Sequence, residues 1–164
     1  MREITAKEID ENIIKMISDE LMLVSAGNES GFNMLTASWG GVGEIWGKDV
    51  ALCVIRPQRY TLGFINKNDK FTLSFYGDNK SVHAVCGKKS GRDVNKAELA
   101  GLTPVFTDGT VTFEQARMTI VCRKLYCQQI DKNCFIDKSL LSYYPDDDFH
   151  YAFVGEIEKV LVND

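Results

Sequence analysis

The amino-acid sequence predicts a mainly β protein whose strands form a closed or partly closed barrel with short peripheral α-helices. Strand-like segments recur along the chain, and short helical patterns separate them at irregular intervals. The regular strand–helix alternation that builds a doubly wound parallel sheet is missing from this pattern. With 164 residues, of which 45% are hydrophobic and 26% charged, the chain is long enough for one domain with a substantial core.

The N-terminal residues are expected to form one amphipathic helix ahead of the barrel. Thr5 and Glu8 have the T-x-x-E spacing of a capping box. Apolar residues follow at helical spacing, and these are Ile9, Ile13, Met16 and Ile17. We therefore expect one domain over residues 1–164, with a helix within 1–20 that ends near Asp19 and a barrel over 21–164.

The barrel strands are expected where apolar residues run together or alternate with polar ones. The clearest alternation is in residues 71–76, where Phe71, Leu73 and Phe75 share one face. The full set of expected strands covers residues 21–26, 32–39, 50–55, 71–76, 104–107, 111–114, 116–130 and 151–162.

Glycine, proline and capping residues mark the expected turns and short helices. Gly40 and Gly41 predict a turn that ends the second strand. Pro57 is suited to the first position of a helix, a second short helix is expected at 81–86, and Asp93 is expected to cap a third.

Composition and charge argue against several classes of partner. A net charge of −4 and a pI of about 5.2 disfavour nucleic-acid binding, which needs clustered positive charge. No apolar run approaches the roughly 20 residues that span a bilayer, and the N-terminus lacks a signal-peptide pattern. We therefore expect a cytoplasmic protein with no membrane partner. The five cysteines form no CxxC pair, so neither a disulfide framework nor a metal site is expected.

Three polar stretches stand out as candidates for ligand binding. The first, Asn33–Trp39, places small hydroxyl residues beside a tryptophan, which suits the close approach of a flat ligand. A sheet face of mixed polarity is the alternative explanation. The second stretch, Arg56–Thr61, lies where a strand leads into a helix, and a helix N-terminus with nearby arginines favours an anion. Alternatively, both arginines pair with Glu44 or Asp49 at the surface.

The third polar stretch, Lys88–Asp93, is a loop with three cations. Lys88, Lys89 and Arg92 lie within five residues around Ser90 and Gly91. Such a loop is able to close over a phosphate, although lysines and arginines in loops are usually only solvated.

The order of these stretches resembles the flavin-reductase-like family of FMN-binding split-barrel proteins, which includes the flavoredoxins. That family has N-x-M-T-A-S-W on its second strand, then R-P-x-R-x-T, then a K-x-S-G-R-D-x-x-K loop, and H-x-x-F-x-G-E-[VI] on its last strand. The matching segments here are Asn33–Trp39, Arg56–Thr61, Lys88–Lys96 and His150–Ile157. The resemblance extends from Leu21 to Val162, nearly the whole chain.

The resemblance implies a split β-barrel (Greek-key-like) that forms a homodimer and holds FMN near the subunit interface. The residues that it places around the isoalloxazine ring and ribityl chain are Asn33, Thr36, Ala37, Ser38 and Trp39. Those that it places near the phosphate are Arg56, Arg59, Tyr60, Thr61, Lys88 or Lys89, Ser90 and Arg92. Ser74 is a further candidate for cofactor binding, and Phe153 and His150 are expected near the reactive face of the ring.

His150 is the candidate catalytic residue, and its alternative role is that of a polar residue at a strand start. The residues before it are Asp148 and Phe149, where flavin reductases often have Gly-Asp. This departure, and the acidic run Asp146–Asp148, bear on whether a nicotinamide nucleotide binds here. His83, on an amphipathic helix, is expected to be structural.

The implied function is electron transfer from NAD(P)H through bound FMN to an acceptor. The flavin carries that chemistry, so no catalytic triad is required. Two alternatives are a flavoredoxin-type carrier that receives electrons from a redox protein, and a split barrel that binds a ligand without turnover.

Overall fold

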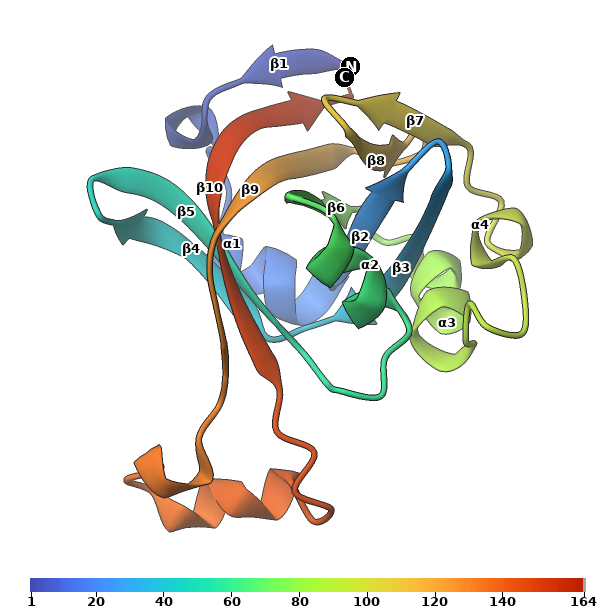
Figure 1. Cartoon of the computed structure of the whole chain (residues 1–164). Coiled ribbons are helices and arrows are strands. Elements are labelled where there is room, and N and C mark those ends of the chain that lie inside the picture. Colours follow the sequence, from blue (N-terminus) through green and yellow to red (C-terminus); the bar gives the residue numbers. More distant parts are fainter. Residues whose placement is uncertain (164) are drawn as a thin grey trace.

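The computed structural model describes residues 1–163, and Asp164, the last residue of the expected domain, lies outside them. An antiparallel sheet of eight strands dominates the fold (Figure 1), in the order β3-β2-β6-β9-β10-β5-β4 with β1 added to β10. Its strands are β1 Arg2–Ile4, β2 Met22–Asn28, β3 Gly31–Ala37, β4 Gly40–Ile45, β5 Lys48–Ile55, β6 Lys70–Phe75, β9 Met118–Gln129 and β10 Tyr151–Val162. A separate hairpin consists of β7 Pro104–Thr107 and β8 Thr110–Phe113. The mainly β fold class is thus confirmed.

The sheet curls because its two edge strands are neighbours in sequence. β3 and β4 lie at opposite ends of the strand order, yet only Ser38 and Trp39 connect them. The three Cα–Cα steps from Ala37 to Gly40 span at most about 11 Å, so the two edges have to come close together. Among residues 1–163 no ladder pairs β3 with β4. The barrel is therefore partly closed, with a split that Ser38 and Trp39 cross.

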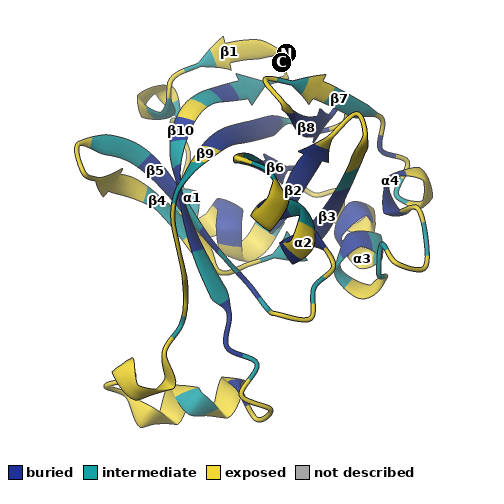
Figure 2. Cartoon of the chain, in the orientation of Figure 1, coloured by how far each residue is buried: buried dark blue, intermediate teal, exposed yellow. Residues whose placement is uncertain are grey.

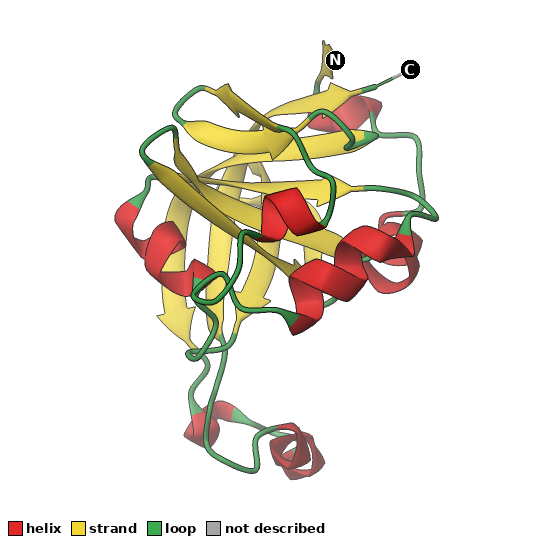
Figure 3. Cartoon of the chain, turned by 90° about the vertical axis from the view of Figure 1, so that its right-hand side faces the viewer, coloured by secondary structure: helices red, strands yellow, loops and turns green. Residues whose placement is uncertain are grey.

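The sheet is buried on both faces along β2, the strand next to the edge strand β3. On one face, Val24 and Phe71 belong to the cluster that fills the barrel interior. On the other face, Leu23 and Met34 belong to a second cluster together with helix residues such as Val82. Figures 2 and 3 show the buried strand centres and the helices outside them. The helices α3 Lys80–Lys88 and α4 Lys96–Leu99 contribute to the second cluster, whereas α2 Thr61–Lys67 contributes Leu62 and Ile65 to the interior cluster.

The single N-terminal helix expected over residues 5–19 is wrong, because the segment breaks into three short pieces. They are a 3₁₀ turn Ala6–Glu8, the one-turn helix α1 Ile13–Lys15 and a π-type turn Met16–Glu20. The Glu8 carboxylate accepts a hydrogen bond from the Thr5 N–H at 2.7 Å, but the chain is extended again at Ile9. The break has a local cause: the Asn12 side chain accepts from the Lys15 N–H at 3.1 Å and starts a new turn.

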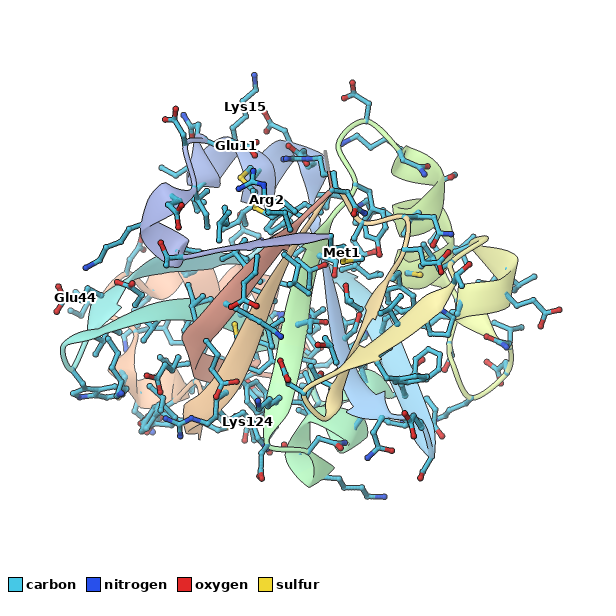
Figure 4. All side chains as sticks on the ribbon, turned by 90° about the horizontal axis from the view of Figure 1, so that it is seen from above. Met1, Arg2, Glu11, Lys15, Glu44 and Lys124 are labelled. Carbon is cyan, nitrogen blue, oxygen red and sulfur yellow. The ribbon has the colours of Figure 1, made fainter. Side chains whose placement is uncertain are left out.

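The N-terminal residues also supply a strand that the sequence pattern did not predict. β1 pairs with the end of β10, with Arg2 opposite Val162, so the two ends of the described chain lie side by side. Figure 4 looks onto this end of the barrel, with Met1 and Arg2 across it and Glu11 and Lys15 on the outer side of the N-terminal segment.

Three boundaries set by turn residues differ from expectation. Gly40 and Gly41 begin strand β4 and do not form a turn. A Cβ on Gly40 would lie 2.2 Å from the Leu52 carbonyl oxygen, so only glycine lets β4 pass this close to β5 at that point. Pro57 precedes the helix instead of starting it, because the Arg59 N–H donates to the Arg56 carbonyl at 3.1 Å and closes a turn around it.

The third difference concerns the cap of the helix after the basic loop. Asn95, not Asp93, is the capping residue, and its side chain accepts from the Glu98 N–H at 3.3 Å. The helix α4 therefore begins at Lys96, which fixes the position of that lysine.

Residues 131–149, between β9 and β10, form a protruding segment that extends away from the barrel (Figures 1 and 3). It contains the 3₁₀ turns Lys132–Cys134 and Lys138–Tyr143. Most of the segment is exposed, and Ile136 is 99% exposed. Its C-terminal part returns toward the barrel at the split.

We predict that Gly155→Ala destabilises the fold by about 1–3 kcal/mol, because its methyl group would overpack the core. A Cβ at this position would lie 2.8 Å from the Cys122 Cβ and 2.8 Å from the Phe71 ring. Gly43→Ala is the control, since a Cβ there meets nothing within 4 Å. Urea unfolding measures both, and equal stabilities would contradict this account of the core.

Candidate functional site

A cleft of about 280 Å³ lies at the split of the barrel, and we call it the split cleft. Its lining residues are Leu35, Thr36, Ala37, Ser38, Trp39, Val54, Ile55, Arg56, Arg59 and His150. They come from the end of β3, the link to β4, the end of β5 and the start of β10. Four of the five residues expected around a flavin ring, all except Asn33, are therefore brought together with His150.

A second hollow of about 240 Å³ lies beside it, and we call it the basic hollow. Its lining residues are Gln58, Arg59, Tyr60, Thr61, Gly87, Lys88, Lys89, Ser90, Gly91, Arg92 and Lys96. The turn before α2 and the loop after α3 thus face each other, as their expected role in phosphate binding requires. Arg59 lines both the split cleft and the basic hollow, so the two cavities adjoin.

The basic hollow concentrates positive charge without a compensating carboxylate. Five cationic side chains line it, namely Arg59, Lys88, Lys89, Arg92 and Lys96. Within residues 1–163, none of these five forms an ion pair with Asp or Glu. Unpaired cations that converge on one cavity repel one another and favour the entry of an anion.

Two of these cations are held by backbone carbonyl groups. Lys96 is only 4% exposed, and its Nζ donates to the Met34 and Cys86 carbonyl oxygens. The Arg59 Nη2 donates to the same Cys86 oxygen at 3.3 Å. Burial lowers the pKa of Lys96 to about 8 and also lowers the pKa of Arg59. Both shifts have burial as their main cause, and no carboxylate among residues 1–163 pairs with either cation to offset it.

Asn33 connects the loop to the helix start instead of lining the split cleft. It is 4% exposed, and its Nδ2 donates to the Thr61 Oγ1 at 3.1 Å. A Cβ on Gly91 would lie 2.3 Å from the Asn33 Oδ1, so only glycine allows the loop to pass this close. Asn33 therefore positions Thr61 and Gly91 in the wall of the basic hollow, and its expected contact with the flavin stays a prediction.

The outer rim of the basic hollow consists of Tyr60 and Arg92. The Arg92 guanidinium lies over the Tyr60 ring, 4.8 Å from its centroid, and its Nη1 donates to the Gln58 carbonyl at 3.3 Å. Ser90 turns the loop, because its Oγ accepts from the Arg92 N–H at 3.2 Å. Lys88 and Lys89 are exposed at the mouth of the hollow.

Arg56 lines the split cleft and does not line the basic hollow. Its Nη1 is 2.5 Å from the Asp148 Oδ2, and its Nη2 donates to the Tyr143 carbonyl at 2.8 Å. Gln58 donates to the same carboxylate at 2.8 Å. Hydrogen bonds from Gln58 and Arg56 lower the pKa of Asp148. Arg56 thus ties the protruding segment to the cleft, and its partner is neither Glu44 nor Asp49.

Aromatic side chains border the cleft on the side of the protruding segment. The ring of Trp39 lies 5.4 Å from that of Tyr143 and 5.0 Å from that of His150. The Tyr144 hydroxyl is 2.9 Å from the His150 Nδ1. Burial, helped by Arg56, lowers the pKa of His150 to about 4, so its imidazole is neutral near pH 7.

The acidic run Asp146–Asp148 carries less free negative charge than the sequence suggested. Asp148 pairs with Arg56, and Asp147 pairs with Lys132 at 2.7 Å. The ion pairs offset two of the three carboxylates near the cleft entrance.

Two residues expected at the cofactor lie away from both cavities. Ser74 is fully buried, and its Oγ lies 3.0 Å from the Thr119 Oγ1 and 3.4 Å from the Thr112 Oγ1. Its strand position turns it toward the β7–β8 hairpin, where the hydroxyls satisfy one another. Phe153 is 1% exposed and belongs to the barrel interior, so it packs the core and does not face the cleft.

Several residues at the site were not predicted from the sequence. Lys96 is the last residue of the Lys88–Lys96 segment, so its place in that motif could have identified it as a site residue. Tyr143 and Tyr144 reach the cleft only because the protruding segment folds back, which no local pattern indicates. Asp148 was expected near the site as part of the acidic run, but its ion pair with Arg56 was not predicted.

Within residues 1–163, no three His, Cys, Asp or Glu side chains group to hold a metal ion, and the cysteines are free thiols. In the same part of the chain, no helix has the length and apolar character needed to cross a membrane.

Comparison with known proteins identifies the family. A model of the flavin reductase like domain matches residues 15–164. No curated protein sequence matches the chain. Among solved structures, flavoredoxin from Methanosarcina acetivorans superposes with a TM-score of 0.70 at 19% identity, covering 88% of this chain and 69% of that one.

Two further structures are similar. An FMN-binding protein from Thermus thermophilus gives a TM-score of 0.69 at 21% identity, covering 99% of this chain and 80% of that one. A Shewanella frigidimarina protein with a split barrel domain gives 0.68 at 17% identity, covering 88% and 67%. The fold is therefore that of the split-barrel proteins, and the family supports a flavin-binding redox function. The chain belongs to the flavin reductase-like domain family.

Proposed function

We propose that the chain binds FMN, with the ring system in the split cleft and the phosphate in the basic hollow. The observation that carries this proposal is the set of five cations without carboxylate partners, directly beside a cleft lined by Ala37, Ser38 and Trp39. The two cavities share Arg59, as a ligand with a flat end and an anionic end requires.

The residues present fit such a ligand in several respects. Small side chains at Ala37 and Ser38 leave room for a planar group beside Trp39. Gly91 and Ser90 let the loop backbone approach a phosphate closely, and Lys96 and Arg59 offer donors from the buried side. FMN binding by the Thermus thermophilus protein of similar fold supports the choice of FMN.

We further propose that the protein is an oxidoreductase that takes electrons from NAD(P)H and passes them to an acceptor. Bound FMN supplies the hydride and electron chemistry, which the side chains lack. The side chains bind the flavin and orient it and the electron donor. Arg56, fixed by Asp148, forms part of the edge of the split cleft and holds the protruding segment beside it. His150, neutral and held through its Nδ1 by Tyr144, hydrogen-bonds without adding charge.

The aromatic border favours a nicotinamide donor, because Trp39 and Tyr143 offer ring surfaces for a flat heterocycle. The pairing of Asp147 and Asp148 reduces the repulsion that an anionic nucleotide would meet. A flavoredoxin-type carrier that takes electrons from a redox protein is the second candidate, favoured by Asp148-Phe149 ahead of His150 and by the flavoredoxin neighbour. A split barrel that had given up phosphate binding would have little use for the unpaired cations of the basic hollow.

We propose a homodimer as the assembly. The protruding segment exposes Ile136, Leu140 and Tyr143, and beside it an apolar hollow of about 430 Å³ contains Tyr126 and Phe135. A second copy that covers this surface would remove apolar area from water. The cytoplasmic location stays a prediction.

Arg59→Ala is predicted to weaken FMN binding about 10- to 100-fold, because a charge-assisted hydrogen bond from a half-buried donor is lost. Arg92→Ala is predicted to cost less than about 3-fold, since Arg92 is exposed and stacked on Tyr60. Lys15→Ala, on the N-terminal segment, is the matched control for loss of one surface cation. Quenching of FMN fluorescence measures all three, and equal losses for Arg59 and Arg92 would refute the assignment.

Anaerobic mixing of the FMN-loaded protein with NADH or NADPH is predicted to bleach the yellow flavin absorption promptly. If the yellow colour persists with both nucleotides but bleaches when a reduced electron-transfer protein is added, the reductase proposal is wrong and the flavoredoxin-type carrier is supported. Photoreduction of the same sample is the control that the bound flavin accepts electrons.

We predict that His150→Gln makes the free energy of unfolding fall less steeply as the pH drops from 6.5 toward 4. The pKa of His150 in the folded protein, about 4, lies below the ordinary 6.5, so the unfolded chain binds the extra proton. The free energy of unfolding therefore falls as the pH drops from 6.5 toward 4, by at most about 1.4 kcal/mol per pH unit for one histidine. Urea unfolding at a series of pH values measures this slope, and an unchanged slope in the variant would contradict a neutral His150.

A further inference from the structure

His83 is a buried titratable residue to which the proposed electron transfer assigns no role. It lies on α3, is 5% exposed, and packs beside Tyr76 with the ring centroids 6.0 Å apart. Burial lowers its pKa to about 4, with a further contribution from Lys80. The imidazole is thus neutral near pH 7 and carries one ring proton.

One ring nitrogen of His83 contacts a residue of the split cleft. Its Nδ1 lies 3.1 Å from the Oγ1 of Thr36, and Thr36 lines the cleft. Thr36 is on the face of β3 that α3 covers, as Met34 is, so its hydroxyl lies between the helix and the cleft. The histidine therefore reaches the cleft only through this hydroxyl.

The other ring nitrogen distinguishes the two possible tautomers. The His83 Nε2 is buried and has no hydrogen-bond partner among the described residues. A buried N–H without an acceptor is rarer and costlier than an acceptor without a donor. The proton therefore belongs on Nδ1, from which it is donated to the Thr36 Oγ1.

This arrangement leaves the Thr36 hydroxyl proton free for another acceptor. The nearest internal acceptor is the His83 carbonyl oxygen at 3.5 Å, which is the limit for a hydrogen bond. An acceptor in the split cleft would compete well with it, and a hydroxyl that already accepts a hydrogen bond is a better donor.

We propose that His83 is a positioning residue that fixes the Thr36 hydroxyl as a hydrogen-bond donor into the split cleft, toward a ring acceptor of the flavin. This inference rests on the proposed function. A histidine that only filled space would be replaceable by phenylalanine without any effect on ligand binding. The two roles therefore predict different results for the same variants.

The test combines Thr36→Val, His83→Phe, His83→Asn and the double variant Thr36→Val/His83→Phe. FMN affinity is measured by fluorescence quenching, and thermal unfolding of each ligand-free variant reports its folding. We expect each of the first two changes to weaken FMN binding about 5-fold, the effect of one net hydrogen bond. His83→Asn, whose amide is able to replace Nδ1, should stay within about 2-fold of the unchanged protein.

The double variant supplies the decisive comparison. If His83 acts through Thr36, the double variant binds FMN no more weakly than Thr36→Val alone. Additive losses, or a loss with His83→Asn equal to that with His83→Phe, would overturn the assignment.

Nitrogen-15 NMR of the unsubstituted protein tests the same claim without any variant. The assignment requires a protonated Nδ1 and an unprotonated Nε2 on His83, and the opposite tautomer would overturn it even if His83→Phe does not fold. If the unsubstituted protein takes up no FMN, the proposed function fails and the assignment fails with it. If it binds FMN but the losses are additive, only the role of His83 fails.

Discussion

The two-residue connection from β3 to β4 is the constraint on which the rest of the structure depends. Strands at opposite edges of the sheet have to meet at Ser38 and Trp39, so the sheet curls around one interior. The edges meet without pairing, and the split that remains becomes the cleft. The same closure brings the end of β5, and hence Arg56 and Arg59, next to the end of β3. The short connection between β3 and β4 thus determines both the curl of the sheet and the position of the site.

The electrostatics of the site follow from what the fold buries beside that cleft. Lys96 and Arg59 are held against the Cys86 carbonyl oxygen and not against carboxylates. Burial without a counter-charge lowers both pKa values, which signifies a cost to the folded protein in the absence of an anion. By contrast, Arg56 is neutralised by Asp148 and ties the protruding segment to the barrel. The two arginines of one short motif therefore have different roles.

Most of the strands, though not β1 and β4, were predicted from the sequence because strand periodicity is a local property. The order of the motifs along the chain, a feature shared with the family, indicated which stretches come together. The N-terminal helix was predicted wrongly because the Asn12 cap overrides the apolar spacing that continues through it. Ser74 and Phe153 were misplaced because periodicity shows that a residue alternates, but not which face meets a cavity. Tyr143 and Tyr144 were missed, and the ion pair of Asp148 with Arg56 was not predicted, because both depend on the tertiary path of the protruding segment.

The central claim is that the basic hollow binds the phosphate of a flavin whose ring lies in the split cleft. Comparison of FMN with riboflavin, which has the same ring and no phosphate, tests this most directly. Isothermal titration calorimetry should give a dissociation constant for FMN at least about 100-fold below that for riboflavin, since the dianion meets unpaired cations. Equal dissociation constants for the two ligands would contradict the account.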